Sequence, residues 1–405
     1  MIDSIYIEKH TNKKLAQDKI LLINKILAKN TSVHHGFLGG SLGLLYYYYH
    51  AGKVLQNNQL LTNAENLLAK VFEDINTTAA GMNGPLFGNG AAGFAYTVNY
   101  LQQNAYIDFD IDNEFADLEK YLYSSAKDLL AADDIDYLHG AIGIVHYFTT
   151  RAGNSNVIKG YLNILTNEIC LKAIDHKDGI WFKNYSLERL KENNTVDFGL
   201  AHGLSGILLI LIKAWPFLNS KEQAEKIIKL GIQFILAHQF SADKDELEEH
   251  SLFPCTLNND SNQLMRISRL AWCYGDINHI LLLYRAGKLT GNSYYTDKAD
   301  EIGFNLIERK SVEATLCKDS HFCHGSAGLA QFYKCLYNES GHHKYYEAYE
   351  FWINQTLLFV NEDISSNAYK ENSVGLLEGW AGVALVLTEY IHQGPAMNWA
   401  KAFLL

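Results

Sequence analysis

A short glycine motif recurs along the whole chain and constrains its fold more than any other feature. The motif has two glycines three residues apart followed by an apolar run, as in GGSLGLLYYYY from Gly39 and HGLSGILLIL from His202. Such self-similarity is typical of repeat architectures, in which each repeat is one supersecondary unit. The first glycines of the seven copies are Gly40, Gly90, Gly140, Gly203, Gly275, Gly325 and Gly379.

The spacing of apolar residues predicts two helices in each repeat. The motifs open apolar stretches such as 207–215 and 383–391, which we interpret as buried inner helices. Between the motifs, apolar residues recur on one helical face, and this pattern predicts amphipathic outer helices. No segment alternates cleanly with period two, so we expect strands to be minor. One outer face is formed by Ala224, Ile227, Ile228, Gly231 and Ile235.

Seven such pairs can form an open solenoid or a closed ring. The inner helices are apolar all round rather than along one stripe, and this favours closure because a closed ring buries them on every side. We therefore predict an all-α protein, an α/α toroid of seven helical hairpins with inner and outer rings, built as one domain over residues 1–405. The polar stretch 241–262 is interpreted as a surface loop or lid.

Charge and composition exclude several classes of protein. The formal net charge is −11, which argues against a protein that binds nucleic acid through phosphates. The start, MIDSIYIEKHTNKK, has no apolar core before a cleavage site, so it does not read as a secretory signal. Apolar runs stop well short of the roughly 18 residues that a membrane span needs. We expect a cytoplasmic protein whose six cysteines are free thiols or metal ligands.

Two neighbouring motifs carry residues that suit a metal ion. Cys273 directly precedes the fifth motif, and Cys323 with His324 occupies the same place in the sixth. Two thiols and one imidazole are a tetrahedral zinc set that leaves one position open, and this predicts one Zn²⁺ per chain and no other cofactor. An electron-rich site of this kind favours a thiolate nucleophile over hydrolysis. The alternative is that both cysteines are small buried apolar residues.

These residues resemble the lanthionine synthetase C family over essentially the whole chain. The resemblance rests on the seven motifs together with WCYG at 272–275, CHG at 323–325 and AHG at 201–203. It implies an α/α toroid whose zinc ligands are Cys273, Cys323 and His324. It also implies a lanthionine synthetase, a peptide cyclase that adds a cysteine thiol to dehydroalanine or dehydrobutyrine in the same peptide and so forms thioether rings.

The resemblance further assigns four catalytic residues. His202 matches the catalytic histidine of the family, Asp136 its aspartate, and Arg269 a conserved arginine, while Tyr274 follows the first zinc ligand as it does in the family. Simpler interpretations stay open: His202 as a hydrogen-bonded residue at a helix start, Asp136 as a carboxylate that complements a helix dipole, and Arg269 as an ion-pair partner. In the fifth motif Asn278 replaces the second glycine, so that hairpin is expected to pack differently. The other motif histidines, interpreted as structural, are His34, His35, His139 and His279.

The same resemblance suggests partners and rivals. The substrate would be a dehydrated precursor peptide made by a separate dehydratase and removed by an exporter, with the cyclase in the cytoplasm or peripheral to a membrane-associated complex. One rival shares the fold and adds glutathione or another small thiol to dehydroamino acids. More distant rivals are a prenyltransferase subunit, whose zinc set usually includes aspartate, and a peptide-binding toroid without catalytic activity.

Overall fold

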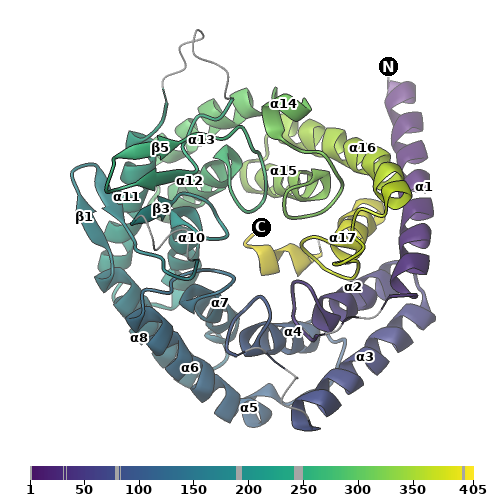
Figure 1. The fold of residues 1–405 in the computed structure, drawn as a ribbon, viewed down its shortest axis with the longest axis horizontal. Helices are drawn as coiled ribbons and strands as arrows, with labels where there is room; N and C mark the ends of the chain where they lie inside the picture. Colours follow the sequence, from purple (N-terminus) through teal and green to yellow (C-terminus); the bar gives the residue numbers. More distant parts are fainter. Residues whose placement is uncertain are drawn as a thin grey trace. The chain divides into compact units, whose positions relative to one another are not determined.

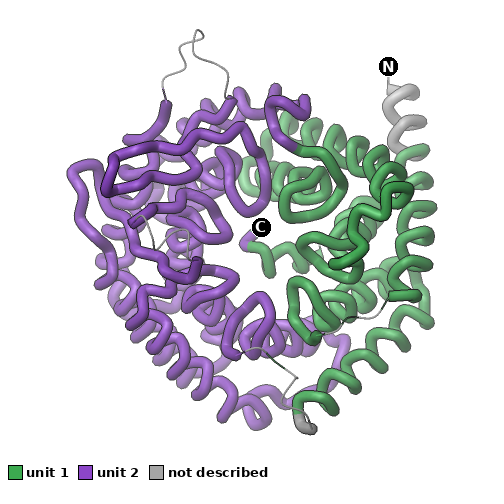
Figure 2. The backbone as a smooth tube through the Cα atoms, in the orientation of Figure 1, with its two compact units in different colours: residues 1–83, 317–403, 405 green, residues 84–316, 404 purple. Residues whose placement is uncertain are grey.

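The computed structural model covers 405 residues and divides them into two compact units (Figure 2). Unit 1 consists of Met1–Asn83 and Cys317–Phe403 with Leu405, and unit 2 of Gly84–Leu316 with Leu404. The structure describes residues 2–30, 32, 34–77, 82, 84–187, 194–240, 250–394 and 397–405. Figure 1 shows the helices and strands of both units and labels them where there is room.

The glycine motifs mark where the inner helices begin. In each of seven helices among the described residues, the first motif glycine is the N-terminal cap. The most apolar of them are buried on every side, and all residues of Trp380–Ile391 are buried. The helices are α2 (Ser41–Val54), α4 (Ala91–Gln103), α7 (Ala141–Arg151), α10 (Leu204–Ala214), α12 (Asp276–Thr290), α15 (Ser326–Ser340) and α17 (Trp380–Ile391).

Seven further helices in the described ranges precede or separate them, as the amphipathic segments predict. In α11 the buried residues include all five apolar positions of the predicted face. The opposite face of each outer helix is polar and accessible to solvent. Because only one face is apolar, the helical spacing of the apolar residues could be recognised in the sequence. The outer helices are α1 (Ile2–Leu27), α3 (Asn58–Thr77), α6 (Ala116–Ala131), α8 (Asn156–Leu171), α11 (Glu222–Ala237), α13 (Ser293–Leu306) and α16 (His343–Ser366).

Each unit is assembled from adjacent inner helices with outer helices packed on them. In unit 2, α7 contacts both α4 and α10, and α10 contacts α12. In unit 1, α17 contacts α15 and α2, and the first helix, α1, packs on α17. The hairpins α2–α3, α12–α13 and α15–α16 pack as pairs. Short helices complete the described part: α5 (Ile111–Glu114), η1 (Trp215–Phe217), α14 (Val312–Thr315) and η3 (Asn398–Phe403).

The second motif glycine is required by close packing of backbone against backbone. A Cβ at Gly206 would lie 2.0 Å from the carbonyl oxygen of Leu200, which belongs to the loop that enters the same helix. No side chain fits at that distance, so the glycine offsets its low helix propensity by letting the loop fold over the first helical turn.

The two long intervals between motifs hold small antiparallel sheets in unit 2. Strand β1 (Ile174–His176) pairs with β2 (Gly179–Trp181) in a two-stranded sheet, with Ile174 opposite Trp181. A second sheet has the order β3 (Thr195–Asp197), β4 (Thr256–Asn258) and β5 (Gln263–Met265). Of the stretch predicted as a loop or lid, residues 241–249 lie outside the described residues, while β4 is hydrogen-bonded on both sides and Leu257 is buried.

Candidate metal centre and active site

The loop that carries Cys273 is held by backbone contacts with the loop before α10. The carbonyl oxygen of Cys273 accepts hydrogen bonds from the N–H groups of Leu200 at 2.8 Å and Ala201 at 2.9 Å. Gly275, which follows, has a φ of 129°, whereas the first glycines of the other motifs lie between −102° and −140°. That conformation favours glycine, so the fifth motif enters its helix along a different path from the others.

Asn278 accounts for this difference. Its side-chain amide donates to the carbonyl oxygens of Trp272 at 3.0 Å and Ala271 at 3.4 Å, and its Oδ1 accepts from Leu200 N at 3.3 Å. At Gly206, for example, the missing side chain allows the carbonyl oxygen of Leu200 to approach the helix. In the fifth motif the fully buried amide of Asn278 fills that space and donates to the corresponding carbonyl oxygen, that of Trp272. The departure from the motif therefore fixes the backbone next to Cys273.

A buried ion pair fixes the other side of the same loop. The carboxylate of Asp276 accepts from the N–H groups of Leu252 and Phe253 and from Arg309 Nη1 at 2.6 Å. Arg309 also donates to the carbonyl oxygen of Ser268. Burial raises the pKa of Asp276, and the charge of Arg309 opposes that shift. Because both ions are buried, removing one partner would leave an uncompensated charge.

Cys323 and His324 lie at the entry of α15 in unit 1. Cys323 N donates to the carbonyl oxygen of Leu377 at 2.8 Å, and His324 N donates to His321 Nδ1 at 3.1 Å. Asp363 binds the preceding turn, because its Oδ2 accepts from both the N–H and the hydroxyl of Ser320. The loop is therefore held before and at the two residues that the sequence singles out.

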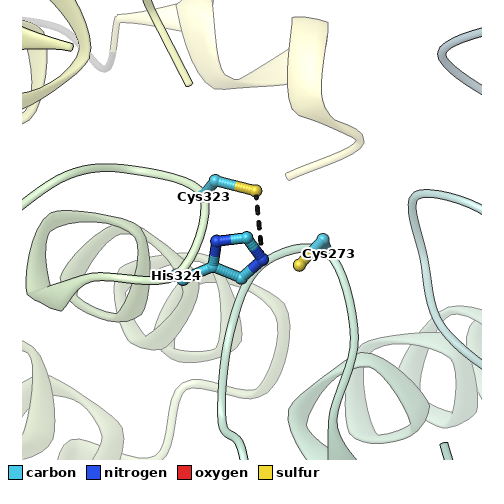
Figure 3. Close-up of side chains that lie close together, drawn as sticks. All are labelled: Cys273, Cys323 and His324. Atoms are coloured by element: carbon cyan, nitrogen blue, oxygen red, sulfur yellow. Dashed lines mark hydrogen bonds between the residues drawn. The ribbon is translucent and has the colours of Figure 1, made fainter. Parts of the chain in front are cut away.

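The three predicted ligands come from both units: Cys273 belongs to unit 2, and Cys323 and His324 belong to unit 1. Figure 3 draws these side chains, whose two thiols and one imidazole are a possible donor set for a metal ion. A tetrahedral zinc ion with ordinary bond lengths would separate its sulfur and nitrogen ligands by about 3.6 to 3.8 Å. Within unit 1, the Sγ of Cys323 and the Nε2 of His324 are 3.7 Å apart. The types of donor, the spacing of this pair and the burial of both thiols fit Zn²⁺.

His202 and Asp136 form a hydrogen-bonded pair in unit 2. The Nδ1 of His202 lies 2.6 Å from Asp136 Oδ2, with the carboxylate fully buried and the imidazole 20% exposed. The other oxygen, Oδ1, accepts from the N–H groups of Leu138 and His139. Asp136 therefore caps the turn before α7 and also orients the imidazole of His202. The Nε2 of His202 is the ring nitrogen that Asp136 does not contact.

The electrostatics of this pair favour a charged imidazole. Burial disfavours the charge on His202, but the hydrogen bond and negative charge of Asp136 outweigh it and raise the pKa of the imidazole. Burial likewise opposes ionisation of Asp136, yet the contact with His202 lowers the pKa of the carboxyl. The neighbouring His139 stacks on His202 with ring centroids 5.8 Å apart, and burial lowers its pKa. The two pKa shifts therefore favour the protonated form more at His202 than at His139.

Arg269 and Tyr274 flank Cys273 on the same loop. The guanidinium of Arg269 lies over the Tyr274 ring, 6.0 Å from its centroid. Burial raises the pKa of Tyr274, and the charge of Arg269 opposes the shift. Within the part of the chain that the structure describes, the Nε of Arg269 is buried without a hydrogen-bond partner. Its guanidinium is nevertheless close enough to Tyr274 to oppose the rise in the pKa of that phenol through both charge and a hydrogen bond.

One residue of this region escaped the sequence analysis. Asn184 is 5% exposed, and its amide donates to Asp136 Oδ2 and to the carbonyl oxygen of His202. It belongs to no motif and follows a strand in one of the long intervals, so only the folded chain reveals its position.

Comparison with known proteins identifies the class. Residues 13–404 match the family model described as lanthionine synthetase C-like protein, and the chain belongs to this family. The lanthionine synthetase predicted from the sequence is thereby confirmed at the level of the family.

Particular relatives are also similar. Nisin biosynthesis protein NisC of Lactococcus lactis subsp. lactis is 27% identical over 354 residues, 80% of this chain and 78% of that protein. Glutathione S-transferase LANCL1 of Danio rerio is 27% identical over 139 residues, 34% of this chain and 30% of that protein. A solved structure of nisin cyclase covers 97% of this chain and 98% of its own, with a TM-score of 0.77 and 20% identity. That similarity confirms the predicted all-α fold of the toroid class.

Among the described residues, no helix combines the length and the hydropathy that crossing a bilayer requires.

Proposed function

We propose that this chain is a zinc-dependent lanthionine synthetase that closes thioether rings in a dehydrated precursor peptide. The observation that carries the proposal is the Cys273, Cys323 and His324 donor set together with the His202–Asp136 pair. The loop before His202 is hydrogen-bonded to Cys273 through backbone atoms. A metal that accepts a thiol and a group that donates a proton are the two components that the addition needs.

The reaction balances within the peptide. The cysteine thiol releases its proton to solvent and its sulfur forms a bond to the β-carbon of dehydroalanine or dehydrobutyrine, the carbon–carbon double bond becomes a single bond, and the α-carbon gains a proton from His202, which solvent then reprotonates. A zinc ion in this donor set would act as a Lewis acid that lowers the pKa of the substrate thiol. His202 supplies the proton at the α-carbon from Nε2, and Asp136 holds the ring through Nδ1. Arg269 stabilises the negative charge that develops on the neighbouring carbonyl oxygen.

The donor set favours this function over its rivals. Two cysteine ligands place negative charge on the metal, and this suits thiol activation better than hydrolysis. The set contains no aspartate, in contrast to the ligand set expected for a prenyltransferase. Addition of a small thiol uses the same groups, so only the products distinguish it from ring closure.

The decisive experiment incubates the zinc-loaded chain with a peptide that contains dehydroalanine and cysteine. Ring closure leaves the mass unchanged, so thiols are counted by alkylation before mass spectrometry. We expect the alkylatable thiol to disappear without a change in mass, and the His202→Asn variant to lose roughly 100-fold or more in rate. Glutathione is added in a parallel reaction. A peptide that gains the mass of glutathione while its cysteine stays alkylatable would assign the rival function.

We also propose the cellular setting that the family resemblance implies. The dehydrated peptide comes from a separate dehydratase, and an exporter removes the product. The chain works in the cytoplasm or at the periphery of a membrane-associated complex. Copurification of the tagged chain with those two proteins and the precursor peptide tests this setting.

A further inference from the structure

We propose that Asn184 is a positioning residue that sets the His202–Asp136 pair for proton transfer. The inference rests on the proposed function for its role in the reaction, whereas the geometric part stands on contacts within unit 2. Among the described residues, Asn184 is hydrogen-bonded to Asp136, His202 and Ser186, so it is proposed to act through the pair and not on the peptide.

The amide of Asn184 joins both members of the pair. Its Nδ2 donates to the carbonyl oxygen of His202 at 2.7 Å and to Asp136 Oδ2 at 3.3 Å. The carboxylate oxygen that it contacts is the one that binds the imidazole of His202. One primary amide has two N–H bonds, so it can satisfy both acceptors at once. The backbone of His202 and the side chain of Asp136 are therefore both held by Asn184 Nδ2.

Asn184 is itself held in place. Its Oδ1 accepts from the N–H of Ser186 at 3.2 Å, and Tyr185 N donates to the carbonyl oxygen of Asp133 at 2.8 Å. Asp133 is in turn bound by the ammonium group of Lys172 at 2.6 Å. The segment after β2 is therefore fastened to the turn that leads to Asp136, while its amide reaches the turn that carries His202.

This arrangement has two consequences for catalysis. A donor directed at Asp136 Oδ2 stabilises the charged carboxylate and so keeps the shared proton on the imidazole. It also limits rotation of the carboxyl group, because Oδ1 is held by backbone N–H groups and Oδ2 by Asn184 and His202. Without Asn184 the carbonyl oxygen of His202 would lose a buried donor, and the loop could move the imidazole away from the substrate.

The residue type is specific to this role. An aspartate at position 184 would place a second carboxylate about where the amide now contacts Asp136, and like charges at that distance repel. It would also lose both donors. We therefore expect Asn184→Asp to impair the reaction more than Asn184→Ala, although aspartate has nearly the same shape as asparagine.

A matched control exists in the same unit. The side-chain amide of Asn163 also donates to two carbonyl oxygens, those of Lys159 at 2.7 Å and Phe217 at 3.1 Å, and its Oδ1 accepts from Asn219 N. Asn163→Ala therefore removes a comparable set of hydrogen bonds that does not involve the His202–Asp136 pair. Any loss of stability common to both variants can be separated from the loss of catalysis.

The kinetic test measures cyclisation of the dehydrated peptide by the zinc-loaded chain. We expect Asn184→Ala to lower kcat roughly 10- to 100-fold with KM and zinc content unchanged, because misplacement of a catalytic group acts on the chemical step. Asn163→Ala is expected to change the melting temperature but not kcat. In the Asp136→Asn background, Asn184→Ala should lower kcat less than about threefold further, since the two residues act as a unit. Equal effects of the two alanine variants on kcat, or full additivity with Asp136→Asn, would overturn the proposal.

A second measurement does not depend on activity. The Nδ1 proton of His202, bonded to Asp136, should give a low-field resonance in the proton NMR spectrum of the full chain. We expect Asn184→Ala to move it upfield and Asn163→Ala to leave it in place. An unchanged resonance in Asn184→Ala refutes the positioning role even where the peptide is cyclised. If the wild-type chain cyclises no peptide, the proposed function fails, while the resonance still decides whether Asn184 orders the pair.

Discussion

The pair formed by His202 and Asp136 permits a sharp prediction about pH. In the wild-type chain burial disfavours protonated His202, and the hydrogen bond and charge of Asp136 outweigh it, so the pKa of His202 is raised. Asp136→Asn keeps the shape of the side chain and removes the charge. Burial then dominates, and we expect the pKa of His202 to fall below the ordinary value of 6.5.

The sign of the effect on rate follows directly. With protonated His202 as the proposed proton donor, activity is expected to decline as the pH rises through its pKa. In Asp136→Asn this basic limb should move to lower pH. At a pH above the pKa of His202 in both the wild-type chain and the variant, each unit by which that pKa drops lowers the protonated fraction of His202 about tenfold. The neutral amide also fixes the ring tautomer less well, and together these effects predict a loss of roughly 100- to 10,000-fold near neutral pH.

The assay is kcat against pH for both proteins, measured by thiol alkylation of a dehydrated peptide at saturating concentration. Zinc content and the melting temperature serve as controls, because the loop that leads to His202 is hydrogen-bonded to the backbone of Cys273, a proposed zinc ligand. A basic limb that stays in place in Asp136→Asn, despite a lower rate, would refute the assignment of the proton to His202.

Four further substitutions test the supporting structure. Gly206→Ala should lower the free energy of unfolding by about 1 to 3 kcal/mol or more, because its Cβ would meet the carbonyl oxygen of Leu200 at 2.0 Å. Gly160→Ala, in α8 with open space at the Cβ position, should instead be neutral or stabilising in the same denaturant titration. Asn278→Gly should weaken zinc binding about 10- to 100-fold in a chelator competition, because it frees the carbonyls beside the first ligand. Arg269→Ala should reduce kcat with zinc retained, and a loss of melting temperature in proportion to the loss of rate would mean that it only holds the loop.

The helices could be predicted, and the metal ligands proposed, because both follow local rules. A buried helix that begins under a folded-back loop needs glycine at a fixed offset, so the seven copies are visible in the sequence. Cys273 and Cys323 occupy the same position in neighbouring repeats, and equivalent positions in a repeat architecture are expected to lie close together. The ligand set itself stays a prediction.

The supporting residues could not be predicted, because their partners are distant in the sequence and follow no period. Asn184 lies 48 residues from Asp136 and belongs to an interval without a motif. Asp363 binds Ser320 across 43 residues, and nothing at either position marks a contact. Asn278 was visible as a departure from the motif, but only the folded chain shows that its amide replaces the missing contact. The single domain over residues 1–405 stays a prediction.

The central claim is a zinc ion held by Cys273, Cys323 and His324, and metal analysis of the purified chain tests it most directly. We predict one zinc per chain in the wild-type protein, loss of that zinc in Cys323→Ala, and full zinc in Cys170→Ala, whose cysteine is buried on α8. Because both units have large cores of their own, the Cys323→Ala chain should stay folded, and circular dichroism checks this. Full zinc in a folded Cys323→Ala chain would contradict the account.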